Sequence, residues 1–304
     1  MGKTIITVLP LKLIMRSGFV NILGKPNAGK STLLNALVGE KLAIVSSKVQ
    51  TTRHRIRAFL NGPDYQIVFS DTPGIIEPQY KLHEKMMRAV KSSMEDADVC
   101  LLIADLRDEL TLLDELFSPL KLHVPCIVVL NKCDMVKPPK IQEAVDFFSG
   151  KSYCKQAIVI SASKKINTDE LVKLIVSLLP EGDPFFGEED LTDMPTKFFA
   201  GELIREKIFD LFDQEIPYQT TVMVQGFEEK NTLIKITADI IVQRESQKAI
   251  LLGQGGLMIK KLGTESRISL ESFLGRKIFL QLYIKVRANW RNNDLYLKEY
   301  GYAQ

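Results

Sequence analysis

Short apolar runs and longer amphipathic stretches alternate along the first part of the chain. The apolar runs read FVNIL (19–23), YQIVFS (65–70), VCLLIA (99–104), VPCIVVL (124–130) and AIVI (157–160). Each run has the length of a buried strand, and the stretches between them are long enough for helices. Because parallel strands need long and usually helical connections, this order predicts an α/β domain with a mostly parallel sheet over residues 18–179.

A segment rich in proline, glycine and acidic residues follows at residues 180–195. This composition is typical of a linker, so we expect the segment to be mobile and to be cleaved first by proteases. The pattern then changes to a helix (197–212), strands (220–227 and 233–242), two helical segments around GQGG and a last strand, KIFLQLYIKV. This order predicts a smaller α+β domain over residues 196–304.

Composition and charge limit the possible domain number, partners and location of the protein. The 304 residues suffice for two domains, and the net charge of only +3 means that any nucleic-acid-binding surface must be local. The N-terminal stretch TIITVLPLKLIM is interrupted by Pro10 and Lys12 and lacks the cleavage site of a signal peptide. The four cysteines show no metal-binding spacing. We therefore expect a cytoplasmic protein with reduced thiols, in which residues 1–17 form an extension or translation begins at Met15.

The string GKPNAGKS, residues 24–31, lies between the first strand and a helical pattern. Backbone N–H groups are unpaired at a helix N-terminus and the helix dipole is positive there, so a glycine-rich turn at this point can wrap a phosphate chain. Lys30 adds a cation for the outer phosphates, and Ser31 adds a hydroxyl for magnesium. The loop therefore predicts a nucleoside triphosphate.

Two further strings provide groups for magnesium and the outer phosphate. DTPG places Asp71 directly after a buried strand, where a carboxylate can hold Mg²⁺. Gly74 lets its backbone N–H approach the γ-phosphate without an intervening side chain. The string QTTRH lies between the phosphate loop and Asp71, and of its two threonines we favour Thr52 over Thr51 as a magnesium ligand.

The strings NKCD (131–134) and SAS (161–163) select the base. The Asp134 carboxylate can accept hydrogen bonds from the N1–H and 2-amino groups of guanine, whereas adenine offers an acceptor at N1 and no 2-amino group. A backbone N–H of Ala162 can meet guanine O6. The sequence therefore favours GTP over ATP.

Residues 18–179 resemble a translation-factor-class GTPase domain, because five nucleotide-binding strings occur in the family's order. The resemblance implies catalytic roles for Lys30, Thr52 and Gly74. It implies magnesium ligation by Ser31, Thr52 and Asp71. The implied GTP contacts are Gly24, Lys25, Pro26, Asn27, Ala28, Gly29, Lys30, Ser31, Thr32, Asp71, Thr72, Pro73, Gly74, Ile75, Asn131, Lys132, Cys133, Asp134, Ser161, Ala162 and Ser163.

One residue departs from the signalling GTPases. Ile75 follows DTPG where those proteins place a glutamine that orients the attacking water, and a hydrocarbon side chain cannot hydrogen-bond to water. The chain is similar here to GTPases that hold a potassium ion partly with an asparagine at the position of Asn27. Potassium is therefore a candidate cofactor beside GTP and Mg²⁺. The simpler alternative is that Asn27 only shapes the loop.

The second domain resembles the prokaryotic type of KH domain, because its element order and its GQGG loop match that family. In KH domains the glycine loop lets single-stranded RNA approach the backbone closely. Lysines and arginines follow the loop and are available to phosphates. The predicted RNA contacts are Gly253, Gln254, Gly255, Gly256, Lys260 and Lys261.

The joined domains resemble the Era family of GTPases, and IPYQTTV, QRESQKAILLGQGG and ANWRNN add to the match. The resemblance implies a monomeric ribosome-assembly factor that binds the 30S subunit near the 3′ end of its ribosomal RNA. Some members of the family associate peripherally with membranes. One alternative is an RNA-binding module whose nucleotide domain does not hydrolyse GTP. GTPases that modify transfer RNA, transport metal or carry tandem domains would need a C-terminal cysteine, membrane spans or a second GKS string, none of which appears in the sequence.

Overall fold

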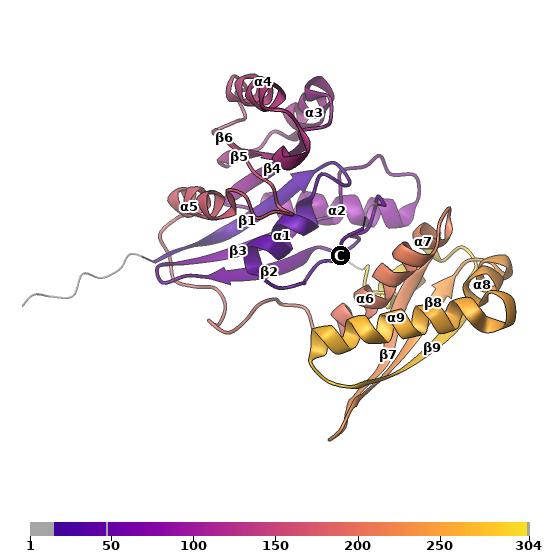
Figure 1. The fold of residues 1–304 in the computed structure, drawn as a ribbon. Coiled ribbons are helices and arrows are strands. Elements are labelled where there is room, and N and C mark those ends of the chain that lie inside the picture. Colours follow the sequence, from indigo (N-terminus) through magenta and orange to yellow (C-terminus); the bar gives the residue numbers. More distant parts are fainter. Residues whose placement is uncertain (1–14, 47, 303–304) are drawn as a thin grey trace, which may run out of the picture.

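The computed structural model describes residues 15–46 and 48–302 (Figure 1). The expectations for the N-terminal extension therefore fall almost entirely outside the described residues. The first strand begins at Arg16, two residues before the predicted start of the first domain. None of the described helices is long and apolar enough to cross a lipid bilayer.

The first domain is built on a six-stranded sheet with the strand order β2-β3-β1-β4-β5-β6. All neighbouring strands run parallel except β2, which pairs antiparallel with β3. The mostly parallel sheet predicted from the sequence is confirmed. The strands are β1 (Arg16–Gly24), β2 (Ile56–Asn61), β3 (Tyr65–Asp71), β4 (Val99–Asp105), β5 (Cys126–Asn131) and β6 (Gln156–Val159).

Helices cover both faces of this sheet (Figure 1). Apolar residues of α1 and α5 pack with Leu101 in one core, and those of α2, α3 and α4 pack with Leu102 in another. Successive residues of β4 thus belong to opposite cores, which explains the uninterrupted apolar run of this strand. The helices are α1 (Lys30–Val38), α2 (Lys81–Glu95), α3 (Leu110–Phe117), α4 (Pro138–Ser149) and α5 (Thr168–Leu178).

The edge strand β2 was not predicted from the sequence. Its contacts with the linker keep that segment close to the sheet. Phe59 of β2 donates its backbone N–H to Leu191 O at 2.9 Å, and Phe186 stacks on the Phe59 ring with 3.9 Å between centroids. Gln66 of β3 accepts the backbone N–H groups of Phe185 and Phe186 at 2.6 and 3.0 Å. These contacts hold the linker against the sheet edge, contrary to the expectation of a mobile segment.

The second domain contains a three-stranded sheet with the order β7-β8-β9, in which β7 and β8 are antiparallel and β8 and β9 parallel. Three helices pack on one face of it, with Ile204, Leu251 and Leu262 meeting alternate residues of β8 such as Ile240. The predicted α+β domain is confirmed. Its elements are α6 (Thr196–Leu211), β7 (Thr221–Glu229), β8 (Ile234–Val242), α8 (Glu245–Leu252), α9 (Leu257–Leu274) and β9 (Ile278–Val286).

The C-terminal segment returns to the first domain (Figure 1). After the short helix α10 (Asp294–Glu299), Tyr302 joins Trp290 in a buried cluster with Leu82 and Met86 of α2. The two domains are therefore joined by a shared apolar cluster as well as by the linker.

Candidate nucleotide and RNA sites

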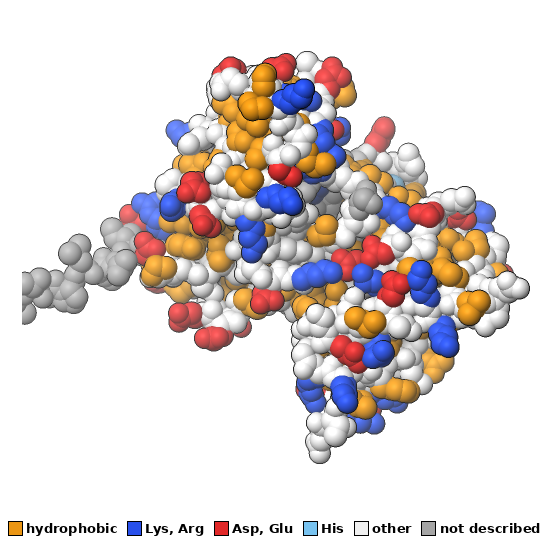
Figure 2. Space-filling view, viewed as in Figure 1, with side chains coloured by type: hydrophobic (Ala, Val, Ile, Leu, Met, Phe, Trp, Pro, Cys, Tyr) orange, Lys and Arg blue, Asp and Glu red, His pale blue; other side chains and the backbone are white. Residues whose placement is uncertain are grey.

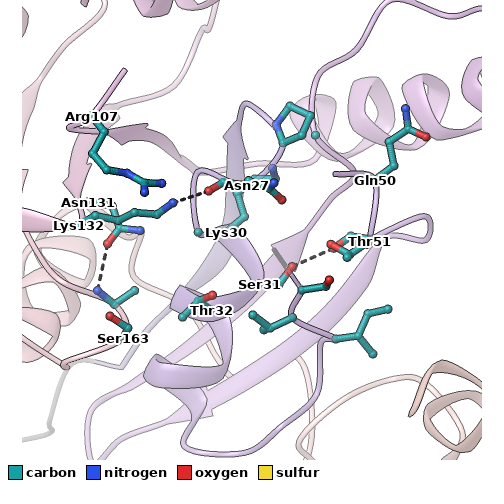
Figure 3. A pocket seen from close by; sticks show the side chains of 18 of the residues that line it. Asn27, Lys30, Ser31, Thr32, Gln50, Thr51, Arg107, Asn131, Lys132 and Ser163 are labelled. Carbon is teal, nitrogen blue, oxygen red and sulfur yellow. Dashed lines mark hydrogen bonds between the residues drawn. The ribbon is translucent and has the colours of Figure 1, made fainter. Parts of the chain in front are cut away.

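A cavity of about 480 Å³ opens at the carboxyl ends of β1, β3, β4 and β5. This is the edge at which parallel α/β sheets bind ligands. Figure 3 shows side chains from the phosphate loop, the segment before β2 and the loops after β4, β5 and β6 arranged around it. Its lining includes Pro26, Asn27, Gly29, Lys30, Ser31, Thr32, Gln50, Thr51, Thr52, Gly74, Arg107, Asn131, Lys132, Ala162 and Ser163.

The phosphate loop joins β1 to α1 and leaves no room for side chains at its glycines. Gly29 has a φ of 103° and caps α1, and a Cβ added there would lie 2.2 Å from the Asn131 amide nitrogen. Lys30 is buried and donates from Nζ to the carbonyls of Gly24 at 3.2 Å and Lys25 at 2.9 Å. Burial lowers the pKa of Lys30 to about 8. An anionic ligand beside the ammonium would favour its charged form.

Three predicted magnesium ligands meet at one point. Ser31 Oγ lies 2.7 Å from Asp71 Oδ2 and 2.8 Å from Thr52 Oγ1, and Thr52 Oγ1 lies 3.4 Å from the same carboxylate oxygen. The other oxygen of Asp71, Oδ1, is buried and has no hydrogen-bond partner. Burial raises the pKa of Asp71, and a cation at this position would oppose that shift. Two hydroxyls and a carboxylate are oxygen ligands that suit Mg²⁺.

The turn that follows β3 is fixed beside the phosphate loop. A Cβ on Gly74 would lie 2.8 Å from both the backbone nitrogen and the Cγ of Pro26, so only glycine fits here. Thr72 donates from Oγ1 to Ile22 O at 3.1 Å, which ties the turn to β1. Ile75 packs against the core on the α2 side and does not line the cavity. Its side chain is therefore not available to orient a water molecule.

The strings predicted to select the base contribute Asn131, Lys132, Ala162 and Ser163 to the other end of the cavity. The Asn131 amide donates from Nδ2 to Ala28 O at 2.9 Å and accepts the Ala162 N–H at 3.0 Å, so it links the phosphate loop to the SAS turn. The Ala162 N–H, expected to face guanine O6, is thus paired with Asn131 in this structure. Asp134 is exposed.

Arg107 also lines the cavity, although no sequence motif predicted it (Figure 3). Its Nε and Nη2 donate to Asp105 Oδ1 at 3.0 Å and Oδ2 at 2.7 Å, and Lys132 Nζ donates to Asp105 Oδ2 and to Asn27 O, each at 2.7 Å. Burial alone would raise the pKa of Asp105, but these hydrogen bonds hold it at about 2. The sequence signal that could have predicted this cluster is Asp105, an acidic residue directly after the apolar run VCLLIA.

The GQGG loop connects α8 to α9 and has the backbone conformation that glycine favours. Gly253, Gly255 and Gly256 have φ angles of 69°, 58° and 79°. A Cβ on Gly253 would lie 2.6 Å from Met258 Cγ, whereas a Cβ on Gly255 would meet nothing within 4 Å. The backbone of Gly255 is therefore open to a ligand.

Basic residues near this loop do not form one continuous patch on the face in view. Lys260 and Lys261 are exposed, and Lys261 lies 4.0 Å from Glu265. Figure 2 shows Lys and Arg side chains mixed with Asp and Glu over the face on which α9 lies. This mixture agrees with the small net charge of the chain.

Two protein families match the chain. The family described as 50S ribosome-binding GTPase matches residues 19–132, and the KH domain family matches residues 215–291. GTPase Era of Geobacter sp. (strain M21) is 42% identical over 292 residues, which cover 94% of this chain and 98% of that protein. GTPase Era of Clostridium botulinum (strain Eklund 17B / Type B) is 41% identical over 96% of this chain and 100% of that protein.

Solved structures match over both domains. The crystal structure of a point variant of Aquifex aeolicus Era bound to GDP·AlF4⁻ superposes with a TM-score of 0.91 at 38% identity, covering 95% of this chain and 100% of that one. The crystal structure of Era in complex with MgGDPNP and nucleotides 1506–1542 of 16S ribosomal RNA also has a TM-score of 0.91, at 39% identity and with the same coverage.

Proposed function

This chain belongs to the Era family of GTPases, and we propose that it hydrolyses GTP with Mg²⁺ in the cavity at the sheet edge and binds small-subunit ribosomal RNA through its second domain. The observation that carries the proposal is the meeting of Ser31, Thr52 and Asp71 beside the phosphate loop, with one buried carboxylate oxygen of Asp71 left unpaired.

The proposed roles follow from the chemistry of each group. Lys30 supplies positive charge to the outer phosphates, and Gly74 presents its backbone N–H there because no side chain intervenes. Ser31, Thr52 and Asp71 hold Mg²⁺, which when bound neutralises charge that develops on the phosphate oxygens. Asp134 provides the carboxylate that selects guanine. The remaining GTP contacts named from the sequence belong to the same proposal.

A hydrolysis assay tests this function. The full chain should release phosphate from GTP faster than from ATP, and EDTA or Lys30→Ala should abolish the release, because the substitution removes the cation at the outer phosphates. Turnover that persists in Lys30→Ala would reject the assignment of the phosphate loop. GTP binding without any turnover, with or without RNA, would favour the alternative of an RNA-binding module with a non-hydrolysing nucleotide domain.

We propose that a potassium ion beside Asn27 assists GTP hydrolysis, because the side chain of Ile75 packs away from the cavity. Ile75 cannot orient water, and the sequence identifies no arginine finger. Charge that develops between the β- and γ-phosphates therefore needs another stabiliser, and Asn27 lines the cavity at the phosphate loop. GTP turnover should be several-fold faster in KCl than in NaCl at equal ionic strength, and Asn27→Ala should remove the difference while GDP affinity changes little. Equal rates in both salts would reject this role.

The RNA partner is proposed from the family and from the loop geometry. The matched Era complex contains nucleotides 1506–1542 of 16S ribosomal RNA, and here the backbone of Gly255 is open at the GQGG loop. We propose that residues 253–256 with Lys260 and Lys261 contact the corresponding RNA near its 3′ end on the 30S subunit. Crosslinking of the full chain to RNA in cells, followed by mapping of the bound nucleotides, tests this partner.

We also propose that the chain works as a cytoplasmic monomer. Sedimentation of the purified protein tests the monomer. Fractionation of lysed cells tests whether a part of it associates peripherally with the membrane.

A further inference from the structure

We infer that the KH domain positions a magnesium ligand of the GTPase domain, with Arg205 of α6 as the positioning residue for Thr52. The inference rests on the proposed function, because it concerns the Mg²⁺ that accompanies GTP. The segment from residue 40 to residue 55 contains neither helix nor strand in its described part. Its position therefore depends on tertiary contacts.

Arg205 reaches this segment from the second domain. Its side chain is 1% exposed, and its Nε donates to Glu202 Oε1 at 2.7 Å. Its Nη2 donates both to the second oxygen of Glu202 and to the carbonyl of Thr51. That carbonyl belongs to the peptide that joins Thr51 to Thr52. Because the peptide is planar, holding the carbonyl orients the bond that leads into Thr52.

A second arginine holds the other side of Thr52. Arg53 is buried and donates to three backbone carbonyls of the second domain, those of Thr220 at 2.7 Å, Pro217 at 2.9 Å and Tyr218 at 3.2 Å. Both neighbours of Thr52 are thus fixed by the second domain, and Thr52 itself touches Ser31 and Asp71.

Helix α6 also contacts the earlier part of this segment, at Lys41, Val45 and Lys48. Glu206 of α6 accepts the Val45 N–H at 3.2 Å and the Lys41 ammonium at 2.6 Å. Lys48 donates to the carbonyls of Phe209 and Phe212 near the end of the helix. A displacement of α6 would therefore move the segment that carries Thr52.

This arrangement predicts that the binding of GTP and the binding of GDP respond differently to loss of the Arg205 contact. In GTPases the segment that carries this threonine is ordered by contacts with the γ-phosphate and its magnesium and is released when that phosphate is lost. GDP has no γ-phosphate, so its binding should be insensitive to the position of Thr52. Loss of the Arg205 contact should weaken Mg²⁺ together with GTP and leave GDP unchanged.

The test compares full-length variants by the Mg²⁺ concentration that half-saturates binding of a non-hydrolysable GTP analogue. Arg205→Met removes the donors and keeps the hydrocarbon stem. Arg205→Met with Glu202→Gln also removes the carboxylate that would be left unpaired, and keeps the test valid if the single variant does not fold. Lys197→Met is the matched control, because Lys197 is an exposed cation on the same helix.

We expect the half-saturating Mg²⁺ concentration to rise about tenfold in the Arg205 variants, as for other groups that orient metal ligands, with GDP affinity within about twofold of wild type. A wild-type Mg²⁺ dependence in a folded Arg205 variant would overturn the inference. Equal weakening of GDP and the analogue would overturn it too, because it would indicate general destabilisation. Failure of the wild-type chain to bind the analogue with Mg²⁺ would instead refute the proposed function.

Discussion

Among single residues, Asp134 is the one proposed to select guanine. It is exposed in the structure and follows the buried end of β5. In Asp134→Asn the amide would present a donor to guanine N1–H, and each lost hydrogen bond to a charged group costs about 1.5–3 kcal/mol. We expect GTP to bind about 10- to 100-fold more weakly and xanthosine triphosphate to bind better than in wild type.

Competition against a fluorescent GDP analogue would measure both affinities. Asp146→Asn is the matched control, because Asp146 is an exposed carboxylate on α4 that accepts only from Gln142 of the same helix in the described structure. An unchanged GTP affinity in Asp134→Asn would remove the main reason for preferring guanine.

The sequence predicted those site residues that lie within short, recognisable motifs. Lys30, Ser31 and Asp71 follow buried strands within recognisable motifs, and the structure brings the last two together at 2.7 Å. Arg107 was not identified, because an arginine two residues after a strand has many surface roles. The pairing of the Ala162 N–H with Asn131 depends on how the end of β5 meets the turn after β6, and no local pattern encodes that meeting.

At the scale of elements, the GQGG loop allows a substitution that changes charge without crowding. Gly255 has a φ of 58°, and a Cβ there would meet nothing within 4 Å. Aspartate tolerates this backbone region better than most residues. Gly255→Asp would set a carboxylate against the RNA backbone, so we expect RNA binding to fall at least about tenfold while GTP binding stays unchanged.

Gly275 provides a matched control at the far end of α9. It has a φ of 64° and equally open space around an added Cβ, so Gly275→Asp introduces the same charge and the same backbone strain away from the loop. RNA affinities should be measured for both variants at one salt concentration. Equal losses in the two would contradict the assignment of RNA binding to the GQGG loop.

The buried side chain of Gln66 anchors the linker to the sheet. Gln66 is fully buried and accepts the backbone N–H groups of Phe185 and Phe186. Two hydrogen bonds of about 1 kcal/mol each make local opening of the linker at least about tenfold rarer. We expect Gln66→Ala to be cleaved within residues 180–195 at least about tenfold faster than wild type in limited proteolysis. The control, Gln79→Ala, changes an exposed glutamine, and equal cleavage rates in the two variants would show that Gln66 does not secure the linker.

The elements predicted from the sequence are those whose apolar residues form a continuous run or recur at helical spacing. The five parallel strands, β1, β3, β4, β5 and β6, and the helices α1, α6 and α9 follow from apolar runs and helical spacing. Strand β2 was missed because its sequence, IRAFLN, includes an arginine and an asparagine, and because it lies at a sheet edge where Arg57 and Leu60 are partly exposed. The linker composition suggested mobility, but Phe185 and Phe186 provide apolar anchors within it.

At the scale of the whole molecule, the relation between the domains was not predictable from the sequence. It depends on contacts between residues more than 150 positions apart, such as Arg53 with Thr220 and Arg205 with Thr51. Local periodicity contains no information on such pairs. Through these contacts, a displacement of the second domain would also move the segment that carries Thr52.

His54 lies at this junction and should make it sensitive to acid. Its ring stacks on Tyr302 with 4.4 Å between centroids and meets the edge of Phe198 at 5.3 Å. Burial, with the nearby positive charges of Arg205 and Arg53 and against the opposing effect of Glu202, lowers the pKa of His54 to about 4. The pKa of an unfolded histidine is about 6.5, so the neutral ring stabilises the fold fully above that pH, and this contribution is lost as the pH falls towards 4.

Between pH 7 and pH 5 we expect the free energy of unfolding to fall by on the order of 1–2 kcal/mol from His54 alone, which lowers the thermal midpoint by a few degrees. His54→Phe keeps an aromatic ring at the junction but cannot be protonated, so its midpoint should fall less over this range. His83, whose pKa burial also lowers to about 4, adds a similar loss in both proteins and cancels in the comparison. His123→Phe, at an exposed position, should follow the wild type. If the midpoint of His54→Phe falls as steeply with acid as that of the wild type, His54 is not the group that couples the domain junction to pH.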